Sequence, residues 1–131
     1  MGSKAKILAV DDENDVLLII KTALQAEGYE VVTAVNGPDA LETVATEQPD
    51  AIILDVMMPG MDGFEVLTRL RADAQTQDTP VIMLTGISDR AKIQEALDKG
   101  TQYFIVKPFE FLDLISKVKL ALRDAAEDKI I

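Results

Sequence analysis

The stretch that decides the fold is Ala51–Gly63, which reads AIILDVMMPGMDG. Its first four residues are apolar and favour a buried β-strand, and Asp55 follows directly at the end of that strand. Pro59 and Gly60 then mark a loop. The stretch therefore predicts a strand that delivers a carboxylate at its C-terminal end.

Three other apolar runs end in polar side chains in the same way. They are the runs at 7–10, before Asp11 and Asp12, at 81–84, before Thr85, and at 103–106, before Lys107. In an open parallel sheet the C-terminal ends of the strands lie together at one edge, where ligands bind. Three carboxylates, a hydroxyl and an ammonium gathered there suit a divalent cation and a phosphoryl group.

The rest of the chain alternates short apolar strands with amphipathic helices. Strands are expected at Lys6–Val10, Tyr29–Val35, Ala51–Leu54, Val81–Leu84 and Tyr103–Val106, with Asn36 and Gly37 as a turn, and helices beginning near Asn14 or Asp15, Pro38, Phe64, Asp89 and Phe109. The helix residues expected to face the core are Val16, Ile20, Ala23, Leu24, Ala40, Leu41, Val44, Ala45, Phe64, Leu67, Leu70, Ile93, Ala96, Leu97, Phe111, Ile115, Val118 and Leu122. This pattern predicts an α/β fold, (βα)5, with a doubly wound, parallel five-stranded sheet covered by helices on both faces.

Composition limits the possible functions. The 131 residues fit one domain, 1–131, without a linker, a repeat or an output domain, and the net charge of -10 weighs against nucleic acid and anionic membranes as partners. The chain has no Cys and no His, which excludes disulfides, zinc fingers, histidine acid–base catalysis and Ser-His triads. No apolar run is long enough to span a membrane and no signal peptide fits before the first strand, so we expect a cytoplasmic protein.

Each charged residue singled out above also has an ordinary explanation. Asp11 and Asp12 can cap the next helix, Asp55 can be a turn residue, and a lone lysine such as Lys107 is usually a surface residue. Thr85 is also a common strand residue. Together, however, carboxylates about 4 Å apart repel by roughly 4 kcal/mol per pair, at an effective dielectric constant near 20. A compensating cation is therefore expected, and a few oxygen ligands beside a phosphate suit Mg²⁺ better than Ca²⁺.

Four motifs in this order resemble the receiver domain of two-component response regulators. They are VDDE at 10–13, LDVMMPGMDG at 54–63, LTG at 84–86 and VKPF at 106–109. The resemblance extends from about Lys6 to about Arg123, and it implies the flavodoxin-like receiver fold. It also implies a signalling switch that accepts a phosphoryl group from a sensor histidine kinase or a phosphotransfer protein.

The resemblance implies a role for each acidic residue. Asp55 matches the phosphoacceptor, which attacks a phosphohistidine. Asp12 and Asp55 would bind Mg²⁺ directly, together with the backbone carbonyl of Met57, while Asp11 would act mainly through water. These assignments place the metal and the attacking oxygen side by side.

The resemblance also implies a switch. Thr85 and Lys107 would contact the new phosphoryl group, and Phe104 matches the switch aromatic. Movement of Thr85 would let Phe104 fill the vacated space and alter the surface of the fourth helix, fifth strand and fifth helix. The alternative for Phe104 is a plain core aromatic. The Lys107-Pro108 bond is expected to be cis, as is typical of the family.

The sequence departs from one large class of transcription-factor receivers. Gln102 and Tyr103 stand where that class has an acidic pair used in its dimer, which weighs against the same dimer here. The positions two residues after Asp55 and after Thr85 hold Met57 and Ile87. Both are apolar and cannot orient a water, so we expect a self-phosphorylating protein with slow autodephosphorylation and not an enzyme with turnover.

Two other functions compete with the switch. An aspartyl-phosphate-forming phosphohydrolase would usually carry a second Asp where Met57 stands. A flavin-binding module would need a phosphate-binding Gly/Ser/Thr-rich loop after the first strand, where Asp11, Asp12 and Glu13 would repel the phosphate. The sequence names neither the kinase nor the downstream target.

Overall fold

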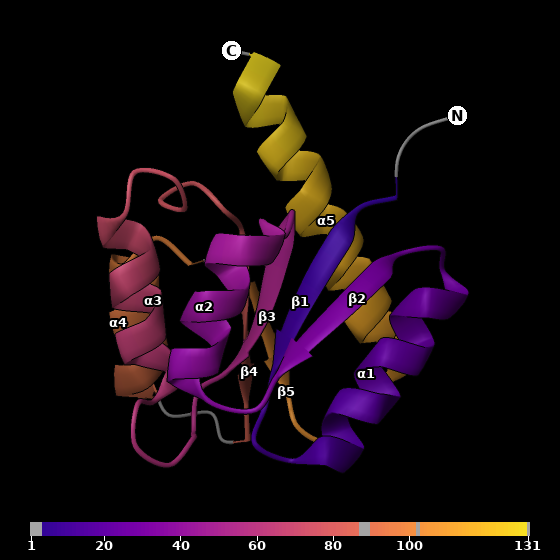
Figure 1. Cartoon of the computed structure of the whole chain (residues 1–131), viewed down its shortest axis with the longest axis horizontal. Helices are drawn as coiled ribbons and strands as arrows, with labels where there is room; N and C mark the ends of the chain where they lie inside the picture. The colour runs from indigo at the N-terminus through magenta and orange to yellow at the C-terminus, as the bar shows by residue number, and fades with distance from the viewer. Residues whose placement is uncertain (1–3, 87–89, 102, 131) are drawn as a thin grey trace.

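The computed structural model describes residues 4–86, 90–101 and 103–130. Strands and helices alternate through these segments (Figure 1). The elements are β1 (Lys6–Val10), α1 (Asn14–Ala26), β2 (Glu30–Ala34), α2 (Gly37–Glu47), β3 (Ala51–Asp55), α3 (Gly63–Ala72), β4 (Val81–Thr85), α4 (Arg90–Asp98), β5 (Tyr103–Val106) and α5 (Phe111–Ile130). No helix in the described part of the chain is both long and apolar enough to cross a membrane.

The five strands form one parallel sheet in the order β2-β1-β3-β4-β5. β3 therefore lies at the centre, and β1 and β4 flank it. This topology confirms the predicted (βα)5, doubly wound sheet. The connection from β1 leads to one edge of the sheet, and the connections after β2 lead towards the other edge, so the crossover direction changes between β1 and β3. Open α/β folds bind ligands at such a position.

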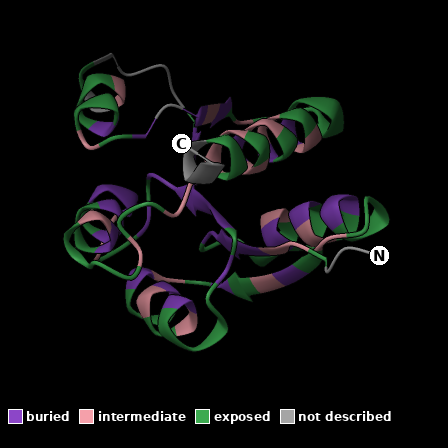
Figure 2. Cartoon of the chain, turned by 90° about the horizontal axis from the view of Figure 1, so that it is seen from above, coloured by how far each residue is buried: buried purple, intermediate pink, exposed green. Residues whose placement is uncertain are grey.

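Helices cover both faces of the sheet, and the two cores follow the alternation of the strands. Ile53 belongs to a cluster with residues of α1 and α5, whereas its neighbour Leu54 belongs to a cluster with residues of α2, α3 and α4. The view from above in Figure 2 shows the same layers, with exposed residues on the outer faces of the helices. Because both faces of the central strands are covered, every residue of β3 and β4 is buried.

Three residues expected in the core are exposed. Ala45 is exposed, Leu97 is 45% exposed and Phe111 is 57% exposed. A helix on a sheet buries only a narrow stripe, and Ala45 and Leu97 lie one position beside it. Phe111 is exposed as the first residue of α5. In the part of α5 whose burial is described, the fully buried residues are Leu114, Val118 and Ala121.

The ends of several elements also differ from the expectation. Glu13, not Asn14 or Asp15, is the N-cap of α1, and its side chain makes no capping hydrogen bond. Asn36, expected in a turn, is the N-cap of α2, where its Oδ1 accepts a hydrogen bond from Asp39 N at 2.8 Å. β2 is one residue shorter at each end than expected, and α5 begins two residues later. Asp89, the expected start of α4, lies outside the described residues.

Candidate functional site

The sheet brings the predicted polar residues to one edge. Asp55 is the last residue of the central strand β3, and Thr85 is the last residue of the neighbouring β4. Asp11 follows directly after β1, and Lys107 follows directly after β5. Parallel pairing in register places all four strand ends at the same edge, so sequence-distant side chains become neighbours.

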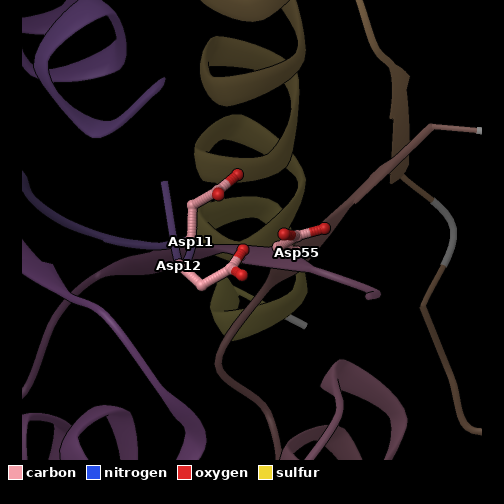
Figure 3. A group of neighbouring side chains, drawn as sticks. All are labelled: Asp11, Asp12 and Asp55. Carbon is pink, nitrogen blue, oxygen red and sulfur yellow. The ribbon is translucent and has the colours of Figure 1, made fainter. Parts of the chain in front are cut away.

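Three carboxylates meet at this edge. One oxygen each of Asp11, Asp12 and Asp55 lies within 4.8 Å of the other two (Figure 3). Asp11 is fully buried and Asp55 is 3% exposed, while Asp12 is exposed to solvent. The cluster is therefore open on one side, as a site that receives an ion or a phosphoryl group must be.

Backbone amides fix the two buried carboxylates. Asp11 Oδ1 accepts a hydrogen bond from Glu13 N at 2.9 Å, and Asp55 Oδ1 accepts one from Met57 N at 3.2 Å. Each bond reaches two residues ahead, into the loop that follows the strand. These bonds occupy one oxygen of each carboxylate and leave the other to face Lys107.

Lys107 supplies the positive charge of the site. Its Nζ lies 2.7 Å from Asp11 Oδ2 and 3.3 Å from Asp55 Oδ2. The contact with Asp55 has hydrogen-bond geometry, whereas Asp11 Oδ2 is paired by charge without a well-aligned hydrogen bond. Burial lowers the pKa of Lys107, but the close contact and attraction of Asp11, and next of Asp55, outweigh burial, so the pKa is raised and the side chain stays charged.

The Asp55 carboxyl is a weaker acid than an ordinary aspartate. Burial, and next the repulsion from Asp11, raise its pKa to about 6, although Lys107 and the amide of Met57 act in the opposite direction. One ammonium therefore does not compensate the negative charge at this edge. A divalent cation beside the carboxylates would complete the compensation.

Two glycines, Gly63 of the 54–63 motif and Gly37 at the start of α2, occupy positions where a side chain would not fit. A Cβ on Gly63 would collide with the carbonyl oxygen of Asp55, and Gly63 N donates a hydrogen bond to Val56 O at 3.0 Å. A Cβ on Gly37 would come within 2.8 Å of the Met61 side chain. Gly63 therefore sets how closely α3 approaches the phosphoacceptor candidate, a role that its place in a loop motif did not indicate.

The residues expected to act as a switch lie on the adjoining strands. Thr85 is 8% exposed and its carbonyl accepts a hydrogen bond from Lys107 N at 2.7 Å. Phe104 pairs in register with Met83 and is half-buried against the core on the α2, α3 and α4 face. Thr85 lies on that same face by strand alternation, so the two side chains share a face of neighbouring strands. Their packing is compatible with a switch and with a plain core aromatic.

The remaining expectations concern one peptide bond and single positions near the site. The Lys107-Pro108 peptide bond is cis, as expected. Ile87 and Gln102 lie outside the described residues. Glu13, which the sequence suggested only as an acid that would repel a flavin phosphate, places its Oε1 3.9 Å from Lys107 Nζ. Its position in the VDDE motif is the sequence signal that could have indicated this contact.

Comparison with known proteins identifies the group to which this arrangement belongs. The response regulator receiver domain family matches residues 7–119. The chain is 41% identical over 119 residues to response regulator PleD of Caulobacter vibrioides, covering 91% of this chain and 26% of PleD. It is 41% identical over 118 residues to transcriptional regulatory protein PrrA of Mycobacterium tuberculosis, covering 90% of this chain and 50% of PrrA.

The chain thus spans between a quarter and a half of the length of these curated relatives. Among solved structures, chemotaxis protein CheY4 of Vibrio cholerae superposes with a TM-score of 0.87 at 38% identity, covering 91% of this chain and 99% of CheY4.

Proposed function

The chain belongs to the response regulator receiver domain family of two-component signalling, and from this premise we propose that Asp55 accepts a phosphoryl group in a Mg²⁺-dependent reaction. We further propose that residues 1–131 form a single receiver domain. The observation that carries the proposal is the buried Asp55 carboxylate, 3% exposed, held among Asp11, Asp12 and Lys107 at the end of the central strand.

The proposed reaction is a transfer between two side chains. An oxygen of Asp55 attacks the phosphorus of a phosphohistidine, the new P–O bond forms as the P–N bond breaks, and the imidazole nitrogen leaves with the electron pair. A carboxylate attacks only in its ionised form, and a pKa of about 6 leaves Asp55 mostly ionised at neutral pH. Little covalent chemistry is then left to the protein, so positioning and charge compensation carry the rate.

The donor set fits Mg²⁺. Asp12 and Asp55 would hold the ion together with the backbone carbonyl of Met57, and Asp11 would act mainly through water. The fit rests on three carboxylate oxygens within 4.8 Å of one another and on the burial and the Asp11 repulsion that raise the pKa of Asp55. When bound, the ion would neutralise charge on the transferred oxygens.

Lys107 and Thr85 are the proposed protein ligands of the new phosphoryl group. The Lys107 ammonium already lies 3.3 Å from Asp55 Oδ2 and would move only slightly to pair with a phosphoryl oxygen. Thr85, at the end of the next strand, would donate its hydroxyl. Phe104 shares the sheet face of Thr85, so movement of the threonine would change the packing of that aromatic and of the α4, β5 and α5 surface.

The proposed partner is a sensor histidine kinase or a phosphotransfer protein, and the exchange is placed in the cytoplasm, where ATP is available to make the phosphohistidine. We propose a switch with slow autodephosphorylation in preference to a phosphohydrolase. The support is Met57, which occupies the place of a second acid and cannot act as an acid or a base. The proposal leaves the downstream target open.

Incubation with Mg²⁺ and a small acyl phosphate tests this function. The expected result in the intact mass spectrum is one added phosphoryl group on the parent and none on Asp55→Asn, with chelation of Mg²⁺ abolishing the signal. Asp15→Asn, which neutralises an exposed carboxylate of α1, is the matched control and should be modified like the parent. Equal modification of Asp55→Asn and the parent would contradict the assignment.

A further inference from the structure

Met57 differs from the other described methionines in its exposure. Met83 is fully buried, Met58 is 7% exposed and Met61 is half-buried against Gly37, whereas Met57 is 62% exposed. A large apolar side chain held in solvent gains nothing from burial. Its thioether is, however, the sulfur most accessible to a dissolved oxidant among these four.

Met57 is also tied to the phosphoacceptor candidate. Its backbone N–H donates the 3.2 Å hydrogen bond to Asp55 Oδ1, and only Val56 separates the two residues. A change at the Met57 side chain therefore occurs within two residues of the reacting carboxylate.

We propose that Met57 is a redox modification site, and that its conversion to the sulfoxide shortens the lifetime of the phosphoryl group on Asp55. This inference rests on the proposed function. The co-reactant is a hydroperoxide. It transfers one oxygen to the sulfur, so that the O–O bond breaks and an S–O bond forms. The sulfur loses two electrons, and hydrogen peroxide is reduced to water.

The effect follows from the change in polarity. A thioether is a weak acceptor and leaves an attacking water without an orienting partner. A sulfoxide oxygen is a strong acceptor on a side chain of nearly the same length, and it can hold a water beside the acyl phosphate. One hydrogen bond that orients the attacking water corresponds to about a fivefold faster hydrolysis. Because sulfoxide reductases reverse the modification, peroxide would shorten the signal reversibly.

The first measurement ranks the methionines. The unphosphorylated protein receives a limited dose of hydrogen peroxide, and peptide mass mapping follows the added oxygen at each methionine. Met57 is expected to react before Met58, Met61 and Met83. Faster oxidation of any of these three would overturn the proposal.

The second measurement compares phosphoprotein decay in Mg²⁺ before and after peroxide. The parent and Met61→Leu are expected to decay about fivefold faster after oxidation, and Met57→Leu is expected to show no change with peroxide. Met57→Gln, which places an amide oxygen at the same position, should decay faster than Met57→Leu without any oxidant. An unchanged parent, or a Met57→Leu variant that still responds, would overturn the proposal.

The two proposals fail in different ways. If the unoxidised parent takes up no phosphoryl group, the proposed function is wrong and the redox inference falls with it. If the parent is phosphorylated normally but oxidation of Met57 leaves decay unchanged, only the redox inference is wrong.

Discussion

Replacing Asp55 with Asn should stabilise the metal-free protein at alkaline pH. The substitution keeps the shape of the side chain and an oxygen that can accept the hydrogen bond from Met57 N. It removes a buried negative charge that burial and Asp11 disfavour, as the raised pKa of about 6 records. The stabilisation should therefore depend on pH.

The sign and the size of this pH dependence follow from the difference in proton binding between the folded and the unfolded state. The folded state raises the pKa of Asp55 from 3.8 to about 6, so between these values it binds more protons than the unfolded state. The stability of the parent thus falls as pH rises through this window. Above about pH 7 Asp55 is ionised in the folded state, and the full free-energy cost of its buried charge is present. A shift of roughly two pKa units corresponds to about 3 kcal/mol, which Asp55→Asn should recover at pH 8 and lose below about pH 4.

Urea denaturation in a chelating buffer measures this difference. At pH 8 the midpoint of Asp55→Asn should lie about 1 to 2 M urea above that of the parent, and at pH 4 the two midpoints should nearly coincide. Asp15→Asn, at an exposed position, should follow the parent at both values. A variant no more stable than the parent at pH 8, or a gain that is equal at pH 4, would refute this reasoning.

Three further substitutions test other parts of the structure. Asp12→Ala should stabilise the metal-free protein by relieving repulsion and should abolish the rise in melting temperature that Mg²⁺ gives the parent; a surviving Mg²⁺ response would refute this. Gly63→Ala should cost about 1 to 3 kcal/mol in urea denaturation because its Cβ meets the Asp55 carbonyl, whereas Gly86→Ala, whose Cβ meets nothing within 4 Å, should cost much less. Thr101→Val should raise the free energy of unfolding by about 1 kcal/mol. The buried Thr101 hydroxyl has no hydrogen-bond partner among the described residues, and valine has the same shape. A loss of stability would contradict this.

The order of the elements and the place of the site were predictable because they depend on coarse patterns. A buried strand that ends in Asp55 needs only an apolar run and a polar stop, and parallel pairing then places Asp11 and Lys107 beside it. The helix faces were less predictable. Leu97 satisfies a helical period, yet the buried residue is its neighbour Ala96. Phe111 lies three residues before the buried Leu114, yet it is the first residue of α5 and stays 57% exposed.

The finer chemistry depends on contacts that sequence does not specify. The pKa of Asp55 reflects the sum of burial, Asp11, Lys107 and one amide, and these act in opposite directions. The clash that excludes a side chain at Gly63 depends on how closely α3 approaches β3. The exposure of Met57 next to a fully packed strand end is likewise a property of the folded chain.

The most direct test of the central claim is to locate the phosphoryl group within the chain. Borohydride reduces an aspartyl phosphate to homoserine, so treatment of the Mg²⁺-phosphorylated protein followed by peptide sequencing identifies the modified residue. The account predicts homoserine at position 55 and unmodified aspartate at positions 11, 12 and 62. Homoserine at any of those three positions, or at none of the aspartates of a protein that carries the added mass, would contradict it.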